Sequence, residues 1–245
     1  MLKPVAIVLA AGKGTRMKSD LPKVLVPVGG RPMVDYVLDA LAQVGIERTI
    51  VVVGYRSDLV REALAGRPGV AFALQAQQLG TGHAVMACRE LLAGHAGPTL
   101  VVMGDAPLLQ SATVTELLAD FERSRAACVL GTIEKPDPAG LGRVVRDAAG
   151  QFVGIVEEKD ATPQQRQIKE VNMSYYVFDT PSLLAALDEV RADNAQGEYY
   201  LTDVPGVLQA QGKPVRALCA LRPCEALAVN TVEELAAVEA ELRRN

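Results

Sequence analysis

The chain has 245 residues, of which 49% are hydrophobic and 22% are charged, and its formal net charge is -4. This composition is typical of a globular protein, and the length fits one large domain or two small ones. Because tryptophan is absent and no basic run exceeds Arg243-Arg244, we expect no nucleic-acid partner.

The first apolar run, residues 5–11, has the length of a strand and is too short to cross a membrane. No cleavage site of the signal-peptide type follows it. The cysteines have neither the spacing of a zinc site nor that of a redox pair, so we expect them to be reduced and mostly buried: Cys88, Cys128, Cys219 and Cys224. These features predict a cytoplasmic protein without a membrane partner.

Strand-like apolar runs alternate with segments of helical period through the first half of the chain. In chain order we expect a strand at 5–11, a helix at 33–44, a strand at 49–53, a helix at 58–65, a strand at 70–75, a helix at 82–92, a strand at 99–103 and a helix at 113–123. Repeated strand–helix units with nearly continuous apolar strands predict a parallel sheet that is covered on both faces.

The second half of the chain has a different pattern. We expect a strand at 127–134, strands at 143–146 and 152–157 around a hairpin turn at 147–150, a strand at 171–178, helices at 182–191 and 202–211, a strand at 215–221 and a last helix at 232–243. Asn230 and Thr231 offer capping side chains for that helix. We predict one α/β domain over residues 1–245, with a mixed sheet after about residue 125.

The loop after the first strand, residues 9–16, reads LAAGKGTR. Ligands of open parallel sheets bind at the carboxyl ends of the strands, so this loop is the first place to look for a site. Its small residues let backbone N–H groups approach a phosphate, and Arg16 and Lys23 add positive charge. The alternative is a plain tight turn, which the nearby Lys13, Arg16 and Lys23 disfavour.

Two common phosphate-binding patterns do not fit this loop. The P-loop needs two glycines before Lys-Ser/Thr, whereas the order here is Gly-Lys-Gly-Thr. The dinucleotide fingerprint needs a third glycine where Met17 stands. The loop therefore indicates another kind of nucleotide site, and it disfavours a Rossmann-type dehydrogenase.

The segment LAAGKGTRM at residues 9–17, with Leu21-Pro22-Lys23, resembles the signature of the sugar-nucleotide pyrophosphorylases, a nucleotidyltransferase family. Residues 74–84, LQAQQLGTGHA, resemble the uridine-recognition segment of one branch. That branch is the N-terminal uridyltransferase domain of the bacterial bifunctional UDP-N-acetylglucosamine pyrophosphorylase/glucosamine-1-phosphate acetyltransferase. Residues 155–162 and 194–203 are similar to further segments of the same domain, and the similarity runs in order from about Val5 to the C-terminus.

The resemblance implies a Rossmann-like, mixed but mostly parallel sheet with helices on both faces, of the nucleotide-diphospho-sugar transferase type. Residues 1–125 would then bind the nucleotide, and residues 126–245 the sugar phosphate. It implies an enzyme that uses Mg²⁺, UTP and a sugar 1-phosphate, with N-acetylglucosamine 1-phosphate favoured, and releases pyrophosphate. The roles that it implies are nucleotide binding by Leu9, Ala10, Ala11, Gly12, Gln75, Gly80 and Thr81, catalytic phosphate contacts by Arg16 and Lys23, Mg²⁺ binding by Asp105 and Asn230, and sugar-phosphate binding by Gly142, Glu157 and Asn172.

Residue chemistry agrees with these roles, although each residue also has a plain structural interpretation. Asp105 ends an apolar strand and offers the hard oxygen that Mg²⁺ prefers, or it caps a loop or helix. The amide of Gln75 can donate and accept as a uracil edge requires, or it is an ordinary polar strand end. Glu157 binds sugar hydroxyls or is a solvated hairpin acid, and Asn230 caps a helix, binds metal, or does both. For His83 we expect a structural role and no acid–base role.

Departures from the family pattern lie on the sugar side of the expected site. Met103 stands where the family usually has an aromatic residue, and Met173-Ser174 follow Asn172 where the family usually has Thr-Gly. The sequence ends where the family continues into a β-helix acetyltransferase domain, so we expect no acetyl transfer, and the oligomeric state stays open. Alternatives are a transferase that uses another hexose 1-phosphate or dTTP, and a non-catalytic subunit that binds a nucleotide sugar.

Overall fold

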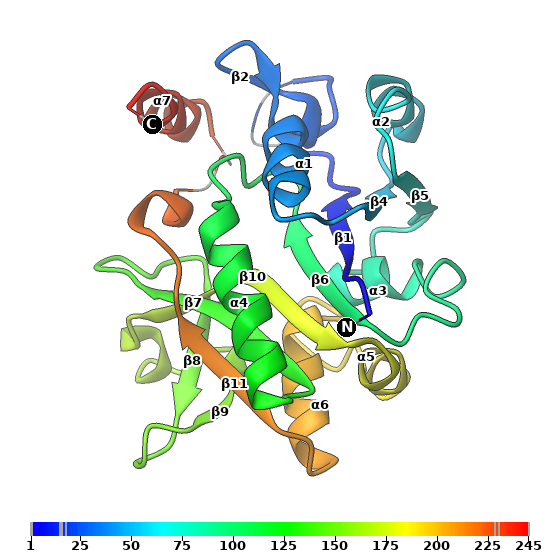
Figure 1. Ribbon diagram of the computed structural model, residues 1–245. Helices are drawn as coiled ribbons and strands as arrows, with labels where there is room; N and C mark the ends of the chain where they lie inside the picture. The colour runs from blue at the N-terminus through cyan, green and yellow to red at the C-terminus, as the bar shows by residue number, and fades with distance from the viewer. Residues whose placement is uncertain (1, 15–16, 18, 228, 230, 245) are drawn as a thin grey trace.

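The computed structural model describes residues 2–14, 17, 19–227, 229 and 231–244, and these build a nine-stranded sheet. The main path of the sheet has the order β11-β7-β10-β6-β1-β4-β5, and the hairpin β8–β9 is attached to β10 (Figure 1). The strands are β1 (Val5–Ala10), β4 (Arg48–Val53), β5 (Val70–Leu74), β6 (Pro98–Met103), β7 (Cys128–Glu134), β8 (Gly142–Arg146), β9 (Phe152–Val156), β10 (Glu170–Asp179) and β11 (Val215–Cys219).

Strand β1 lies in the parallel part of the sheet, between β4 and β6. Ile7 pairs with Ile50 on one side and with Val101 on the other. All six residues of β1 are buried, which explains its continuous apolar sequence, because a parallel strand covered on both faces has no solvent side.

Helices cover both faces of the sheet. One face carries α1 (Met33–Gln43), α2 (Ser57–Ala63) and α4 (Ser111–Ser124), and the other carries α3 (Thr81–Met86), α5 (Thr180–Leu187) and α6 (Val204–Ala210). Val8 of β1 belongs to the same hydrophobic cluster as Leu117 of α4, whereas the adjacent Ile7 belongs to the cluster of Leu183 of α5. Helix α4 crosses in front of the sheet in the view of Figure 1. The predicted fold class is therefore confirmed.

The second half of the sheet is antiparallel around β10, which pairs with β6, β7 and β8. The register with β7 shifts between Asn172 and Tyr175, and the bulge places Ser174 at φ +61°. Such a bulge redirects the side chains that follow it. The expected hairpin is present, and Asp147 Oδ1 accepts hydrogen bonds from the backbone N–H groups of Ala149 and Gln151 in its turn.

Three local features differ from the expectations or were not foreseen. A small hairpin of β2 (Pro27–Val28) and β3 (Arg31–Pro32) turns at Gly29 and Gly30, whose φ angles of +58° and +83° suit glycine. Helix α3 ends at Met86, and turns replace the rest of the expected helix at 82–92. Cys88 and Cys128 are buried as expected, whereas Cys224 is partly exposed and Cys219 is exposed. None of the four forms a disulfide.

The last helix, α7 (Val232–Leu242), begins with a capping box. Thr231 Oγ1 accepts from the backbone N–H of Glu234, and the Glu234 carboxylate accepts from that of Thr231. Val238 of α7 packs in a third hydrophobic cluster with Val28 and Met33, which holds this helix against the small hairpin. Asn230, which we also expected to cap this helix, lies outside the described residues.

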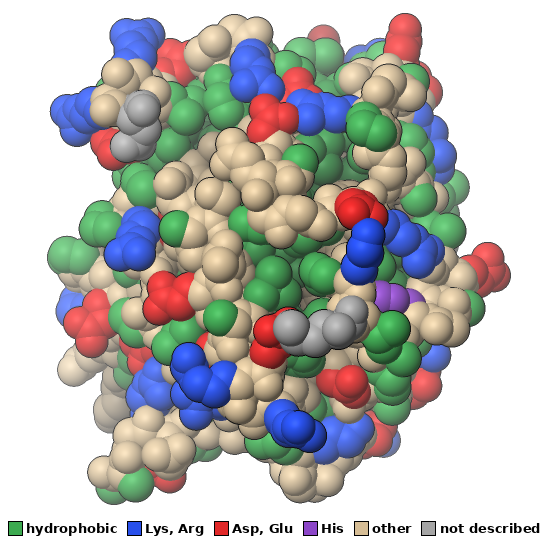
Figure 2. Space-filling model, viewed as in Figure 1, with side chains coloured by type: hydrophobic (Ala, Val, Ile, Leu, Met, Phe, Trp, Pro, Cys, Tyr) green, Lys and Arg blue, Asp and Glu red, His purple; other side chains and the backbone are tan. Residues whose placement is uncertain are grey.

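The face in Figure 2 carries basic and acidic side chains that are interspersed rather than separated by sign. Among the described residues, the structure has no helix with the length and apolar character that crossing a bilayer requires.

Candidate active site

The loop after β1 is fixed between its two neighbouring strands. The backbone carbonyl of Leu9 accepts from Gly104 N–H at 2.9 Å, and that of Ala11 accepts from Tyr55 N–H at 3.1 Å. Leu9, Ala10 and Ala11 are buried, whereas Gly12 is exposed and a Cβ built on it would meet no atom within 4 Å. Of the residues predicted to bind the nucleotide, those at 9–11 therefore lie in the core, and Gly12 lies at the surface at the carboxyl edge of the sheet.

Lys23 and Asp105 meet at this edge. Lys23 begins a short 3-10 helix, and its Nζ donates to Asp105 Oδ2 just beyond the end of β6. Their side chains are only 14% and 17% exposed. Gly14, at φ +66°, lies against Lys23, and a Cβ at Gly14 would be 2.7 Å from Lys23 Cβ. The structure thus joins one predicted phosphate ligand to one predicted metal ligand, while Arg16 and Asn230 lie outside the described residues.

Gln75, the predicted uracil contact, follows β5 and is 4% exposed. Its backbone N–H donates to Val53 O at 2.8 Å, which continues the parallel pairing with β4 past the last residue of the strand. Its side-chain Nε2 donates to Gly80 O at 2.9 Å and lies 3.1 Å from His83 Nδ1. These contacts link Gln75 to the predicted nucleotide residue Gly80.

A later segment of the chain closes over residues 79–82. Tyr199 N–H donates to Leu79 O at 2.8 Å, and Tyr199 O accepts from Gly82 N–H at 2.8 Å. Thr81 Oγ1 accepts from Leu201 N–H at 3.0 Å. Thr81 therefore has a structural contact, and the predicted uridine segment packs against a part of the chain that lies about 120 residues later.

The sheet register brings the three predicted sugar-phosphate residues together. Asn172 of β10 pairs with Gly142 of β8. On the other side of β8, Arg143 pairs with Val156 of the antiparallel strand β9, so the next residue, Glu157, lies opposite Gly142. A Cβ at Gly142 would lie 2.9 Å from Ile155 Cγ2 and 3.5 Å from Glu157 Oε2. A side chain at position 142 would thus overlap Ile155 and lie in van der Waals contact with the carboxylate of Glu157.

The polar groups of Asn172 and Glu157 are held by neighbours. Asn172, 5% exposed, donates from Nδ2 to Tyr176 Oη at 2.7 Å and accepts from Ser174 N–H at 3.1 Å. Glu157 Oε1 accepts from Thr202 Oγ1 at 2.9 Å. Burial raises the pKa of Glu157 and outweighs the opposing effect of the Thr202 hydroxyl. Nearby acidic groups at 160 and 198 raise this pKa further.

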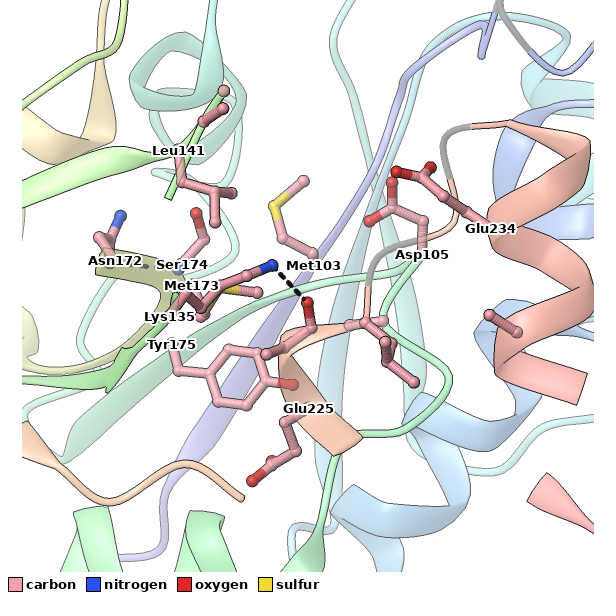
Figure 3. A pocket seen from close by; sticks show the side chains of 16 residues that line it. Met103, Asp105, Lys135, Leu141, Asn172, Met173, Ser174, Tyr175, Glu225 and Glu234 are labelled. Atoms are coloured by element: carbon pink, nitrogen blue, oxygen red, sulfur yellow. Dashed lines mark hydrogen bonds between the residues drawn. The ribbon is translucent and has the colours of Figure 1, made fainter. Parts of the chain in front are cut away.

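A cavity of about 440 Å³ extends between Asp105 and Asn172. Figure 3 shows Asp105 and Glu234 on one side of it and Asn172 and Ser174 on the other. Its apolar wall includes Met103, Leu141 and Met173. The two methionines thus line the cavity at the positions where the sequence departs from the family pattern.

Glu157 lines a second cavity of about 460 Å³, together with Asp160, Asp193, Tyr200 and Asp203. Burial raises the pKa of Asp203 to about 6, and the charges of Glu157 and Asp160 raise it as well. Tyr200 Oη accepts from Gln196 Nε2 at 2.7 Å in this region.

The donor set at the sheet edge fits a hard cation. Asp105 supplies a carboxylate, and Mg²⁺ commonly takes one or two protein carboxylates and completes its shell with phosphate and water. Within the described residues, no group of three or more His, Cys, Asp or Glu side chains gathers as a metal cage would require. The residues present therefore suit an ion that is shared with a phosphate ligand.

A buried arginine beside the sugar-side residues was not foreseen. Arg143 is 1% exposed, and its Nη2 donates to Glu158 Oε2 at 2.6 Å. The same carboxylate oxygen accepts from Gly140 N–H at 3.1 Å, and the hydrogen bond from Arg143 lowers the pKa of Glu158. We call these contacts of Arg143 and Gly140 with Glu158 the Arg143–Glu158 clamp. It connects the residues on either side of Gly142 to Glu158, the residue after Glu157. Its sequence signal is an arginine directly before Val144-Val145 in a short strand that ends at a second arginine, Arg146.

The family comparison decides the class of the protein. The model of the MobA-like NTP transferase domain matches residues 6–198. The chain belongs to this family. The nucleotidyltransferase class that the loop and its resemblance predicted is therefore confirmed.

Curated relatives show the same similarity over nearly the whole chain. The chain is 46% identical over 239 residues to "Bifunctional protein GlmU" of Pelotomaculum thermopropionicum, which covers 98% of this chain and 52% of that protein. It is 50% identical over 217 residues to the protein of that name from Limosilactobacillus fermentum, covering 89% of this chain and 47% of the relative. The chain thus spans about half the length of the curated relatives that it matches.

Solved structures confirm the fold. A UDP-glucose pyrophosphorylase complexed with UDP-glucose aligns over 100% of this chain and 99% of its own, with a TM-score of 0.79 and 16% identity. The apo form of a UDP-glucose pyrophosphorylase gives a TM-score of 0.78 at 15% identity.

Proposed function

We propose that the chain is a uridylyltransferase, which forms a UDP-sugar and pyrophosphate from UTP and a sugar 1-phosphate. N-acetylglucosamine 1-phosphate is the favoured acceptor. Curated relatives with the name "Bifunctional protein GlmU" share 44–50% of aligned residues with this chain, and this similarity supports this branch of the family.

The observation that carries the proposal is the Lys23–Asp105 pair. It lies where the glycine-rich loop after β1 meets the cavity that leads to Asn172. We infer that the Lys23 ammonium contacts phosphate and that the Asp105 carboxylate binds the metal, with the nucleotide on one side of the pair and the acceptor on the other. A phosphoryl-transfer site requires this arrangement more than it requires a covalent nucleophile.

The reaction that we propose is an in-line displacement. A phosphate oxygen of the sugar 1-phosphate attacks the α-phosphorus of UTP, the bond from this phosphorus to the bridging oxygen breaks, and pyrophosphate leaves. Lys23 and Arg16 neutralise charge on the polyphosphate, and backbone N–H groups of residues 10–12 position it. Gly142, Glu157 and Asn172 are the residues that we propose to bind the sugar phosphate, and their adjacency across β8, β9 and β10 supports a shared role.

We propose Asp105 and Asn230 as the residues that hold Mg²⁺. The ion would neutralise charge on the phosphates during transfer, a role that hard oxygen ligands such as a carboxylate support. Lys23 would keep the Asp105 carboxylate in place and contribute its own positive charge to the same region.

Pyrophosphate release, measured over a matrix of nucleoside triphosphates and sugar 1-phosphates with Mg²⁺, tests this function. We expect the highest kcat/KM for UTP with N-acetylglucosamine 1-phosphate. A higher value for another hexose 1-phosphate or for dTTP would identify the corresponding alternative transferase. If no pair releases pyrophosphate while a nucleotide sugar still binds, the chain is a non-catalytic binding subunit and the proposal is wrong.

A further inference from the structure

His83 is a side chain that the proposed reaction leaves without a role. It lies in the first turns of α3, and its Nδ1 is 3.1 Å from the side-chain Nε2 of Gln75. Its ring lies 6.3 Å from that of Tyr199, measured between centroids. The contact with Gln75 bears on the residue that we propose to recognise the base.

The orientation of the Gln75 amide follows from its other partner. Nε2 lies 2.9 Å from the backbone carbonyl oxygen of Gly80, and a carbonyl oxygen can only accept. The NH₂ end of the amide must therefore be the end that faces Gly80. Because this NH₂ group has two hydrogens, the second one is available for His83.

The same NH₂ group fixes the state of the imidazole. A donor that faces Nδ1 requires Nδ1 to accept, so the ring is neutral and carries its hydrogen on Nε2. In this state Gly80 and His83 use both amide hydrogens of Gln75.

What remains of the amide is a pure acceptor. Among the described residues, no donor contacts Oε1 of Gln75. In this part of the chain, the fully buried side-chain atoms without a hydrogen-bond partner are Arg143 Nε and Tyr175 Oη, so Oε1 of Gln75 is not fully enclosed by protein. Oε1 is therefore open to a ligand. An acceptor that lies opposite N3 of a pyrimidine meets the N3–H group of uracil, whereas in cytosine it meets a second acceptor, because the amino hydrogens of cytosine are on N4.

We propose that His83 is a positioning residue that sets the polarity of Gln75 and thereby makes the site select uracil over cytosine. This inference rests on the proposed uridylyl transfer. Without the ring nitrogen, one amide hydrogen loses its acceptor, and the terminal torsion of glutamine has only a broad preference of its own. The position of Oε1 is then held by Gly80 alone.

The kinetic test compares kcat/KM for UTP and CTP in the wild-type chain, His83→Phe and His83→Asn. Phenylalanine keeps a ring but has no acceptor, whereas the asparagine oxygen can replace Nδ1. We expect His83→Phe to reduce the UTP:CTP ratio by at least about tenfold, mainly through the KM for UTP, since an unpaired polar group at a binding site has a cost of this order. We expect His83→Asn to restore most of the ratio.

A matched control comes from the other histidine of the chain, His95, whose Nε2 lies 3.3 Å from Pro98 O, away from Gln75. His95→Phe should leave the UTP:CTP ratio unchanged. Wild-type activity that does not distinguish UTP from CTP, or a ratio that is unchanged in His83→Phe, would overturn the inference. Absence of pyrophosphate release from UTP with every sugar 1-phosphate would instead contradict the proposed function.

A measurement without turnover covers the case in which His83→Phe does not fold. In ¹⁵N-labelled wild-type protein, NMR of the imidazole nitrogens distinguishes the two neutral tautomers. His95→Phe assigns the signals, since only two histidines are present. We expect His83 to carry its hydrogen on Nε2, and a hydrogen on Nδ1 would overturn the inference.

Discussion

Lys23 and Asp105 form an ion pair between the loop after β1 and the end of β6, although 82 residues separate them in the chain. Both side chains are largely shielded from water, so their charges are screened less than those of a surface pair. We expect Lys23→Ala and Asp105→Ala each to lower kcat/KM by at least about a hundredfold, as the loss of a contact to transition-state charge does. Steady-state pyrophosphate release measures this effect.

A surface pair provides the control for these variants. Lys3 and Glu47 lie 2.7 Å apart, but their side chains are 74% and 69% exposed. Lys3→Ala should leave kcat/KM unchanged, because it removes the same charge far from the cavity. Near-normal kcat/KM in Lys23→Ala or Asp105→Ala would contradict the roles that we propose for these two residues.

Gly142 has no side chain, and this absence keeps the space next to Ile155 and the Glu157 carboxylate free. Because a Cβ would be only 2.9 Å from Ile155 Cγ2, Gly142→Ala should displace the adjacent strand and raise the KM for the sugar 1-phosphate by about tenfold. The KM for UTP should not change. Gly154→Ala on the same hairpin is the matched control, since its Cβ would meet nothing within 4 Å. Equal effects of the two variants would refute the sugar-side role of Gly142.

The Arg143–Glu158 clamp should contribute to stability. Arg143 is almost completely buried, and among the described residues its remaining partners after Glu158→Ala are backbone carbonyls. We therefore expect a loss of about 1–3 kcal/mol in the free energy of unfolding. Urea denaturation measures the change. Arg166 is 50% exposed and lies 3.5 Å from the same carboxylate, so Arg166→Ala should cost less than about 1 kcal/mol. A larger loss for Arg166→Ala would be inconsistent with the clamp.

Asp203 should make stability depend on pH. Burial raises its pKa from 3.8 to about 6, so in this interval the folded chain binds a proton that the unfolded chain does not. Its contribution therefore favours folding at low pH and is lost as pH rises through about 6. We expect Asp203→Asn to raise the free energy of unfolding at pH 8, by about 1–2 kcal/mol after an allowance for solvent screening, and to have little effect near pH 4. A stabilisation that is the same at both pH values would contradict this origin.

The fold was predictable because its strands are buried on both faces and therefore appear as continuous apolar runs. The small hairpin at Gly29-Gly30 was missed, although two glycines between short extended segments are a signal for such a turn. The length of α3 was overestimated, because the apolar spacing at 82–92 also fits the succession of turns that follows Met86.

The sequence indicated the candidate site residues one by one, and their roles stay predictions, whereas the contacts between them were not predicted. Strand ends located Asp105 and Gln75, and the resemblance indicated Gly142, Glu157 and Asn172. The sequence could not show that β8 pairs with β10 and thus places Gly142 beside Asn172, because the pattern of apolar residues does not specify which strands pair or in which register. The contacts of Lys23 with Asp105 and of Thr81 with Leu201 were not predicted either, because each joins segments that are far apart in the sequence.

The fate of the α-phosphorus tests the central claim most directly. UTP labelled at the α-phosphorus is incubated with N-acetylglucosamine 1-phosphate, Mg²⁺ and the chain, and the products are separated. Attack on this atom predicts that the label passes into UDP-N-acetylglucosamine, with one unlabelled pyrophosphate released for each labelled product. Label that stays in UTP, or that appears in UMP or UDP without a nucleotide sugar, would contradict the account.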